Sequence, residues 1–416
     1  MKNAHIVIGA QYGDEGKGAT VNLLAQKYPD ALNVRFNGGA QAGHTVTLED
    51  GRRHVFSHFG SGTLQGLDTY FNESSIVNPW RFKDEHTVIM SEFGLSPLVF
   101  VHENALVTSP YDMAINQLWE TCRSGDRHGS CGMGIYETIL RSRKSESLVR
   151  VHELVYHVFE DINDRYKEYA YRRLQDVRDF HPDCEEFIKD TEKFIDSEDV
   201  TRQFFLDYSF FMSMINVVKD DINIYSQYDT VIFEGAQGLQ LDQNYVEYQG
   251  NLPHATPSNP GLGSKSLHNA FEKYDLTEDN IHVYYLTRFY QTRHGNGPFD
   301  REVNPDVLGD IVDLTNIDNP HQGSIRYAPL NVFSLLEAVE FDLQYIDNCR
   351  PYLVVTCVDQ VVNDEVVIKA LHDDSHVKIP FEDLKMILRD NFEFMYGIFY
   401  SDGKSMKYEE HLYVAA

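Results

Sequence analysis

A glycine-rich stretch, GAQYGDEGKGA at residues 9–19, decides the fold of this chain. It follows the apolar run IVI at residues 6–8 and precedes a stretch with apolar residues at helical spacing, so it predicts a turn between a strand and a helix. Such a turn lets backbone N–H groups approach phosphate oxygens, while the helix N-terminus and Lys17 add positive potential. The stretch therefore indicates a nucleotide site.

This stretch departs from the standard phosphate loop, which has Gly, four residues, Gly-Lys and then Ser or Thr. Gln11 stands at the first position, and Gly18 follows Lys17, so no hydroxyl is available there to bind magnesium. Asp14, inside the turn, is the expected replacement ligand. A tight turn that binds nothing is the alternative, and two further segments argue against it.

The second segment, NGGAQAGHT at residues 37–45, follows a strand-like run and delivers His44 on a flexible backbone. A histidine titrates near neutrality, so it can stabilise a phosphate or donate a proton, although a lone histidine is more often an ordinary surface or core residue. The third segment, FEGAQG at residues 233–238, ends a predicted strand and offers Gln237. Open α/β sheets place ligand groups at such strand ends.

The three segments together resemble the signatures of adenylosuccinate synthetases, which are Gln-(Trp/Tyr)-Gly-Asp-Glu-Gly-Lys-Gly, Gly-Gly-x-x-Ala-Gly-His-Thr and Phe-Glu-Gly-Ala-Gln-Gly. Weaker matches follow in order at residues 130–134, 255–259, 292–299 and 356–359. The resemblance therefore covers most of the chain.

The resemblance implies a two-step reaction. A nucleoside triphosphate, GTP or ATP, phosphorylates the 6-oxygen of a purine monophosphate, and the amino group of L-aspartate then displaces that phosphate. Asp14 would remove the N1 proton, His44 would stabilise the transferring phosphoryl group, and Asp14 with the Gly43 carbonyl would bind Mg²⁺. The donor contacts that the resemblance implies are Gly13, Glu15, Gly16, Lys17, Gly18, Thr45 and Asp359.

The resemblance also implies a purine monophosphate site that is completed across a homodimer. Its 5′-phosphate would be held by Thr256 and the Ser130-Cys131 turn, together with an arginine from the neighbouring subunit. We expect this arginine to be Arg141, with Arg143 as the alternative, although an arginine on such a polar stretch can also be a solvated surface charge. The implied substrate contacts are Gln41, Ser130, Cys131, Arg141, Gln237, Thr256 and Arg326.

Departures from the family pattern cluster where substrates are recognised. The family grips the ribose and the aspartate carboxylates with Thr-Thr-Gly-Arg-x-Arg-Arg, whereas residues 320–327 read PHQGSIRY and keep only Arg326. Cys357 replaces the lysine of the donor-reading Thr-Lys-x-Asp element, although Asp359 stays. A viral branch of the family acts on dGMP, and many of its members replace the turn aspartate that this chain keeps. The prediction is dGMP as substrate, with IMP as the alternative.

Two alternatives come from other classes of protein. A nucleotide-hydrolysing switch would hold GTP on the same turns without any aspartate chemistry. A silent nucleotide binder, which binds nucleotide without catalysis, would agree with the loss of arginines from residues 320–327. The presence of both Asp14 and His44 argues against a silent binder, because binding alone needs neither a base nor an acid.

Strand-like and helix-like stretches alternate along the chain, which favours an α/β fold with a mostly parallel central sheet and surrounding helices. Residues 1–144 are expected to form the N-terminal, nucleotide-binding part of the α/β domain. Residues 145–228 have apolar positions at helical spacing and predict a helical subdomain. Residues 229–416 would complete the α/β domain with the substrate and donor-base loops.

Acidic residues outnumber basic ones, 64 to 36, and give a formal net charge of −28. This charge opposes binding to nucleic acid or anionic lipid, so neither is an expected partner. The 5 cysteines are odd in number and lack paired spacing, so they indicate neither a disulfide framework nor a zinc site. With no secretory signal or long apolar run in view, the expected location is the cytoplasm.

Overall fold

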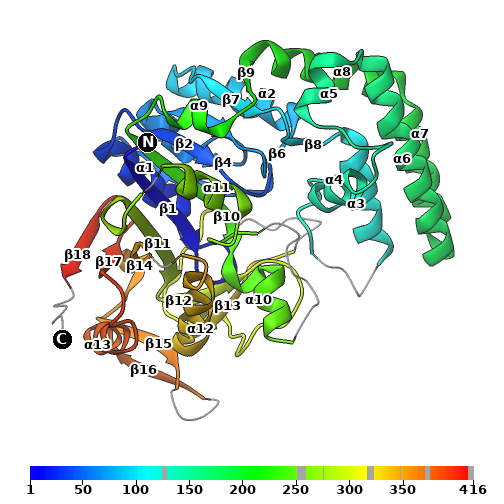
Figure 1. The fold of residues 1–416 in the computed structure, drawn as a ribbon. Helices are drawn as coiled ribbons and strands as arrows, with labels where there is room; N and C mark the ends of the chain where they lie inside the picture. Colours follow the sequence, from blue (N-terminus) through cyan, green and yellow to red (C-terminus); the bar gives the residue numbers. More distant parts are fainter. Residues whose placement is uncertain are drawn as a thin grey trace.

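The computed structural model describes residues 1–123, 129–250, 259–274, 276–315, 323–346, 348–370 and 375–410. It has a large central sheet with helices packed around it (Figure 1), which confirms the predicted α/β class. Among the described residues, the strands of this sheet are β1 (Asn3–Gly9), β2 (Leu32–Arg35), β5 (Asp68–Phe71), β7 (Val99–His102), β9 (Ile215–Val218), β10 (Thr230–Gly238), β11 (Ile281–Arg288), β14 (Arg350–Thr356), β17 (Gly397–Ser401) and β18 (Met406–Glu410).

The order of strands across the sheet is β18-β17-β14-β11-β1-β10-β2-β5-β7-β9. Neighbouring strands are parallel throughout, except for the antiparallel pair of β17 and β18. Parallel strands have their carboxyl ends at the same edge of the sheet, which is where open α/β sheets bind ligands. The predicted turn after β1 and the FEGAQG segment of β10 both lie at this edge.

Strand β1 is apolar on both faces because it lies inside the sheet, between β10 and β11. Ile6 and Ile8 belong to the hydrophobic core shared with α11, α12 and α13, whereas Val7 belongs to the core shared with α1. Such a continuous apolar run is typical of a parallel strand that is buried on both sides. The helices named here are α1 (Lys17–Lys27), α11 (Lys265–Tyr274), α12 (Val332–Leu343) and α13 (Phe381–Asn391).

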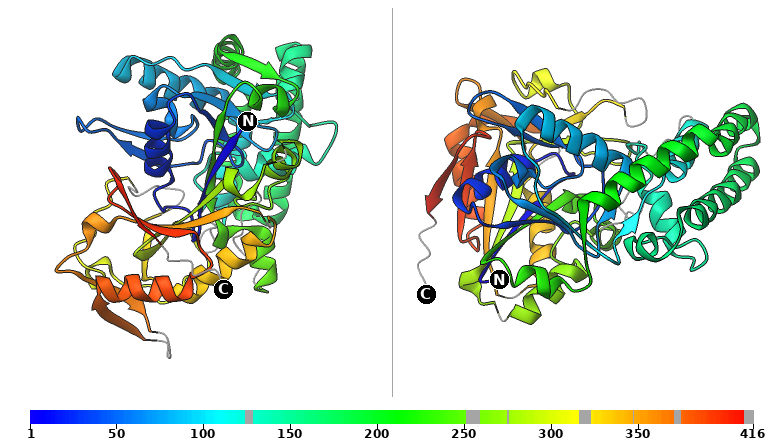
Figure 2. Two further views of the ribbon diagram at one scale, coloured as in Figure 1. Left: turned by 60° about the vertical axis from the view of Figure 1, so that its left-hand side comes forward. Right: turned by 90° about the horizontal axis from the view of Figure 1, so that it is seen from above.

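A helical lobe projects from the sheet beside its β7 and β9 side (Figure 2). Two of its helices precede residue 145, and β9 returns the chain to the sheet before residue 228, so the lobe and the predicted helical segment overlap without coinciding. Among the described residues, none of the helices is long and apolar enough to cross a membrane. The lobe consists of α3 (Pro110–Cys122), α4 (Ile135–Ser142), α5 (Val151–Tyr156), α6 (Phe159–Phe180), α7 (Glu185–Asp196) and α8 (Glu198–Met214).

Short elements complete the described part of the fold. The two-stranded sheets pair β3 (His44–Thr47) with β4 (Arg53–Phe56), β6 (Ile76–Val77) with β8 (Leu106–Val107), β12 (Tyr290–Arg293) with β13 (Arg326–Pro329), and β15 (Glu365–Lys369) with β16 (His376–Pro380). The remaining helical elements are η1 (Ser61–Gln65), α2 (Pro79–Val88), η2 (Ile89–Phe93), η4 (Pro182–Cys184), α9 (Asp221–Tyr225), η5 (Leu239–Leu241), α10 (Gln243–Tyr248), η6 (Glu278–Asn280), η7 (Pro305–Val307) and η8 (Val358–Gln360).

Candidate active site

The turn after β1 is held in shape by its own charged side chains. The Glu15 carboxylate accepts hydrogen bonds from the backbone N–H groups of Gln11 (3.2 Å) and Gly13 (2.7 Å). The Lys17 ammonium donates to the Gly13 carbonyl and lies 3.5 Å from Glu15 Oε2. Burial raises the pKa of Glu15, and the charge of Lys17 opposes this rise. The side chains of Glu15 and Lys17 therefore fix the backbone of this turn.

Glycines let this turn pass close to the end of β10. Gly16 caps α1 at a φ of 86°, in the left-handed region that glycine adopts without strain. A Cβ at Gly13, whose φ is 124°, would lie 3.2 Å from the Gln237 Cα atom, so a larger residue would force the two segments apart. Gln237 itself has a φ of 66°, which is uncommon for a residue with a side chain. The first and third predicted segments are thus packed against each other.

His44, at the start of β3, is held by a buried carboxylate from β10. Its Nδ1 atom lies 2.5 Å from Oε1 of Glu234, whose Oε2 accepts a hydrogen bond from the Ser61 N–H (2.8 Å). Arg35, at the end of β2, approaches the same carboxylate to 3.1 Å. Because Nδ1 faces Glu234, the Nε2 atom of His44 is the ring nitrogen directed away from this cluster.

The charges in this cluster favour an ionised carboxylate and a neutral imidazole. Burial acts to raise the pKa of Glu234, but Arg35 and His44 outweigh it and lower this pKa to about 2. Burial and the charge of Arg35 lower the pKa of His44 to about 4, although Glu234 opposes them. A phosphate beside the imidazole would favour its protonated form. These interactions therefore favour a neutral His44 at pH 7 in the absence of a bound anion.

Asp14 and His44 lie where two cavities meet. The first, of about 340 Å³, is lined in part by α3 and α4 and is called the α3-side cavity. The second, of about 320 Å³, is lined in part by the start of α1 and is called the α1-side cavity. Two ligands, one in each cavity, would meet beside the Asp14 carboxylate and the His44 imidazole. The residues that line both cavities are Gly13, Asp14, Gly43 and His44.

The α1-side cavity has the features of a nucleoside triphosphate site. The N-terminus of α1 and the Lys17 ammonium supply positive potential at one end. Residues that follow β14 and β17 form the other end, where burial raises the pKa of Asp359. The predicted donor residues that line this cavity are Gly13, Gly16, Lys17, Gly18, Thr45 and Asp359, whereas Glu15 braces the turn behind it.

The α3-side cavity is lined by polar side chains from separate segments. Gln41 and Gln237 come from the second and third predicted segments, and Ser130 and Cys131 come from the loop before α4. The side-chain amide of Asn116, on α3, donates a hydrogen bond to the Ser130 hydroxyl (3.1 Å). Burial raises the pKa of the Cys131 thiol to about 11, which favours the protonated thiol at neutral pH.

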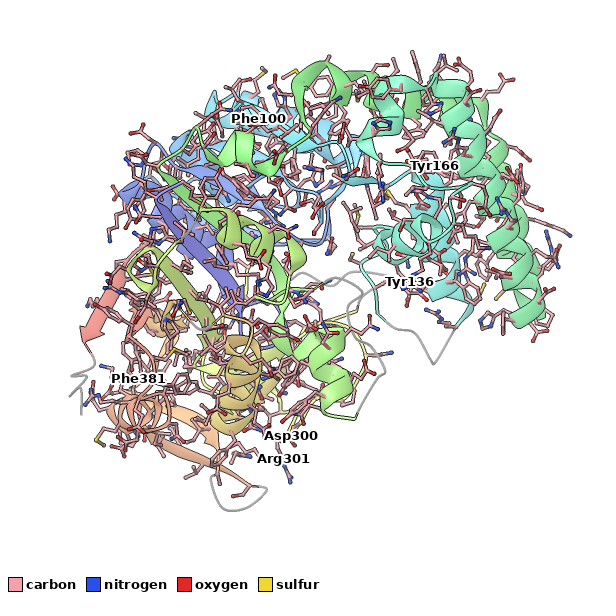
Figure 3. All side chains as sticks on the ribbon, viewed as in Figure 1. Phe100, Tyr136, Tyr166, Asp300, Arg301 and Phe381 are labelled. Carbon is pink, nitrogen blue, oxygen red and sulfur yellow. The ribbon has the colours of Figure 1, made fainter. Side chains whose placement is uncertain are left out.

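Aromatic and cationic groups complete the α3-side cavity. The Arg293 guanidinium lies over the ring of Tyr12, 4.8 Å from its centroid. His294, the next residue, places Nε2 3.7 Å from Asp14 Oδ2. Tyr136, on α4, brings a further ring to the cavity from the helical lobe (Figure 3). Flat rings beside a guanidinium suit an aromatic base that carries a phosphate.

The sequence pattern of the adenylosuccinate synthetase family matches residues 6–317. This chain belongs to that family. It is 30% identical over 311 residues to the adenylosuccinate synthetase of Acaryochloris marina, covering 73% of this chain and 63% of that protein. It is 31% identical over 314 residues to that of Trichodesmium erythraeum, covering 74% and 65%. These matches span slightly less than two thirds of the length of the relatives.

Solved adenylosuccinate synthetases share the fold over nearly the whole chain. The fully ligated enzyme from Plasmodium falciparum has a TM-score of 0.66 at 18% identity and covers 98% of this chain and 100% of that chain. A cyanophage S-2L succinoaminodeoxyadenylate synthetase, PurZ, bound to dGMP and to dATP as an energy donor, has a TM-score of 0.60 at 16% identity and covers 96% and 92%. At these identities the likeness concerns the fold alone.

Arg141 departs from the role that the family resemblance implied. It is fully buried, and its Nε donates a hydrogen bond to Oδ1 of Asp112 (3.0 Å). Its two Nη atoms donate to the carbonyls of Ser147 (2.6 Å) and Val107 (2.7 Å). These contacts within the subunit do not support the expected reach of Arg141 into a neighbouring subunit. Arg143, the alternative, is exposed at the C-terminal end of α4.

Arg326 also lies elsewhere than expected. Its guanidinium pairs with Glu302 (2.7 Å) and donates to the carbonyls of Gly295 (3.2 Å) and Gly297 (3.0 Å). It is not among the described residues that line either cavity, so its position does not support the expected substrate contact and instead indicates a brace for loop 294–298. Thr256 lies outside the described residues.

Several residues of the site were not singled out by sequence reasoning. Glu234 lies inside a recognised signature, but its role depends on contacts with His44 that span 190 positions. Arg288 donates to the Asp14 carbonyl and pairs with Asp313 (3.2 Å), again across the fold. A signature match could have suggested Glu234 and Tyr12, and the weaker match at residues 292–299 contains Arg293 and His294, whereas only the tertiary structure places Arg288 at a cavity.

Proposed function

We propose that this chain is a C–N ligase that phosphorylates the 6-oxygen of a purine monophosphate and then joins L-aspartate to the ring. The observation that carries this proposal is the junction of two cavities at Asp14 and His44. A purine monophosphate in the α3-side cavity would meet the γ-phosphate of a triphosphate in the α1-side cavity there. Phosphoryl transfer depends mainly on positioning and electrostatic stabilisation, which such a junction supplies.

Each residue at the junction has a role in this mechanism. Asp14 accepts the N1 proton, so that O6 becomes nucleophilic and attacks the γ-phosphorus. His44, oriented by Glu234, becomes protonated as the phosphate charge approaches and stabilises the transferring group. Lys17 and the N-terminus of α1 neutralise the triphosphate. The amino group of L-aspartate then attacks C6 and loses a proton, the C6–O6 bond breaks, and orthophosphate leaves carrying O6.

The junction also suits Mg²⁺. Asp14 and the Gly43 carbonyl offer hard oxygen ligands on the walls shared by both cavities. No cluster of three or more metal-ligating side chains occurs among the described residues, which agrees with an ion that uses one or two carboxylates together with substrate phosphates. When bound, the ion would neutralise charge on the donor phosphates.

We propose dGMP as the preferred purine substrate, with IMP as the alternative. The arginine-rich loop that grips the ribose in the family is reduced here to Arg326, which pairs with Glu302 instead. A site without that grip loses little when the 2′-hydroxyl is missing, so a deoxynucleotide is favoured relative to the family's usual substrate. The cyanophage enzyme that shares this fold binds dGMP.

We propose that the donor site accepts both GTP and ATP. The donor base would lie at the end of the α1-side cavity, near Cys357, Asp359 and residues 401–404. Asp359 can accept hydrogen bonds from guanine, but the lysine that accompanies it in the family is Cys357 here. Discrimination between purine bases is therefore weakened. The cyanophage enzyme uses dATP, which supports a relaxed donor preference.

We further propose a homodimer in which Arg143 of one subunit completes the phosphate end of the neighbouring α3-side cavity. Arg143 is the exposed arginine of this segment, on the helix whose first turn lines that cavity. Mixing the two inactive variants Arg143→Leu and Asp14→Asn would restore part of the activity if sites are shared, because one site of each mixed dimer is then intact. A cytoplasmic location stays a prediction from the sequence.

The reaction itself is tested with purified protein, L-aspartate, Mg²⁺, ATP or GTP, and either dGMP or IMP. We expect orthophosphate and a succino-amino purine from dGMP with either donor. Turnover of IMP alone contradicts the dGMP proposal. Triphosphate hydrolysis without any monophosphate would indicate a nucleotide switch, and binding without orthophosphate release would indicate a silent binder.

A further inference from the structure

We propose that His294 is a specificity-determining residue whose imidazole accepts a hydrogen bond from the 2-amino group of a guanine substrate. The inference rests on the proposed function, because it places a purine monophosphate in the α3-side cavity with N1 at Asp14. It adds the side chain that would distinguish guanine from hypoxanthine. These two bases share N1–H and O6 and differ only at ring position 2.

His294 is the neighbour of Asp14 on the substrate side of the junction. Its Nε2 atom lies 3.7 Å from Asp14 Oδ2, and the two side chains are 15% and 22% exposed. His294 lines the α3-side cavity but is not among the described residues of the α1-side cavity, whereas His44 lines both. Asp14 therefore has one imidazole at the junction and a second one within the substrate cavity.

The order of atoms in the purine ring assigns a substrate group to each imidazole. O6 must lie at the junction, since it attacks the γ-phosphorus of the donor, and this is where His44 lies. N1 is the next position and faces Asp14. Position 2 follows N1 on the side away from O6, so its substituent points into the α3-side cavity. His294 is the side chain that borders Asp14 there.

Guanine offers a second donor at this place, and an acceptor there would distinguish it from hypoxanthine. Guanine presents a donor at N1 and another on the 2-amino group, while one Asp14 oxygen accepts the N1 proton and the other is left for the metal ion. The inference requires the neutral tautomer of His294 that carries its proton on Nδ1, because this tautomer accepts through Nε2. The 3.7 Å between Nε2 and Oδ2 exceeds a hydrogen bond. In this tautomer the two atoms are adjacent acceptors for two adjacent donors.

The loop that carries His294 is anchored on both sides. Arg293 donates to the carbonyls of Asn296 (3.1 Å) and Pro298 (2.6 Å), and its guanidinium is packed over Tyr12. Arg326 donates to two glycine carbonyls of the same loop. A side chain on an anchored backbone keeps its direction, and this preorganisation strengthens discrimination between related ligands.

The test uses dGMP and 2′-deoxyinosine monophosphate, which differ only in the 2-amino group. Calorimetric affinities and kcat/KM values are compared for the wild type, His294→Val and His294→Gln. We expect His294→Val to weaken dGMP about 10- to 100-fold, as loss of one buried hydrogen bond does, and to change the deoxyinosine nucleotide less than about threefold. His294→Gln, whose amide oxygen accepts, should retain part of the preference. His152→Val is the matched control, because the His152 side chain on α5 is 47% exposed and its Nδ1 atom also lies 3.7 Å from a carboxylate oxygen, Glu103 Oε2.

An equal loss for both nucleotides in His294→Val would overturn the inference, because it would show a general packing role. A preference for dGMP that survives in His294→Val would overturn it as well, and so would a wild type that binds both nucleotides equally. A wild type that binds dGMP preferentially through His294 but forms no aspartate adduct would support the inference and reject the proposed function.

Discussion

The junction of the two cavities differs from their outer ends, where we propose that the two nucleosides bind. The difference lies in how closely the sequence of each region follows the family pattern. At the junction, Glu15 with Lys17 and Glu234 with His44 are buried pairs that fix the reacting side chains. At the ends, Cys357 replaces a lysine and Arg326 braces a loop instead of lining a cavity. This contrast separates the proposed reaction centre, which needs a fixed arrangement, from the segments that we propose to recognise base and sugar, whose sequence differs from the family pattern.

The strongest test of the junction is Asp14→Asn. An amide cannot accept the N1 proton, so kcat is expected to fall about 100- to 10,000-fold, while the affinity for the purine monophosphate changes much less. Product formation by chromatography and binding by calorimetry measure the two effects. Asp199→Asn, with a side chain 88% exposed, is the control. Full activity of Asp14→Asn would remove the basis for the proposed reaction.

A second change, Glu234→Gln, separates positioning from direct chemistry. The variant keeps the shape of the side chain but removes the charge that favours a protonated His44, so kcat should fall about 100-fold. The pKa of His44 in the complex should also fall, so the pH above which activity declines should move to lower values. A rate loss with an unchanged pH profile would indicate a structural role alone.

The fold offers a matched control for this variant. Glu85 is also a buried carboxylate beside a histidine, with Oε1 3.2 Å from His54 Nε2, and it accepts the His58 N–H at 2.7 Å. It is not among the described residues of either cavity. Glu85→Gln should therefore lower the thermal midpoint while leaving the pH profile of kcat unchanged.

At the donor end, Cys357→Lys should make this chain more like the rest of its family. The residue already has a φ of 60°, so the longer side chain requires no new backbone conformation. We expect the ratio of kcat/KM for GTP over ATP to rise about tenfold, equivalent to ~1.4 kcal/mol. Cys357→Ser adds no charge and should keep the original ratio; a similar rise in that variant would reject the explanation.

The smallest expected effect is proton uptake when the donor binds. The pKa of His44 is about 4 in the described structure, so its imidazole is neutral at pH 7. Phosphate anions raise this pKa, and the complex should therefore take up a fraction of one proton. Titration calorimetry in two buffers of different ionisation enthalpy measures this quantity. His44→Asn should abolish it.

Local signals in the sequence were sufficient to predict the strand, turn and helix around residues 6–27, and to predict that the sheet is mostly parallel. They were insufficient to predict that Arg141 is buried, because its polar stretch is typical of a surface segment. Its partner Asp112 lies 29 positions earlier and closes the capping box of α3. The approach of His294 to Asp14 likewise joins distant segments, and no periodicity or spacing reports such a contact.

The place of β1 in the sheet also has a consequence for biosynthesis. The ribosome makes this strand long before its partners, because β10 and β11 begin only at Thr230 and Ile281. Until more than half of the polypeptide has emerged from the ribosome, the apolar strand β1 and its glycine turn have no neighbouring strands to pair with. Such an unpaired apolar strand is prone to aggregate or to bind chaperones. Fragments that stop before β11 should accordingly be insoluble and bind no nucleotide.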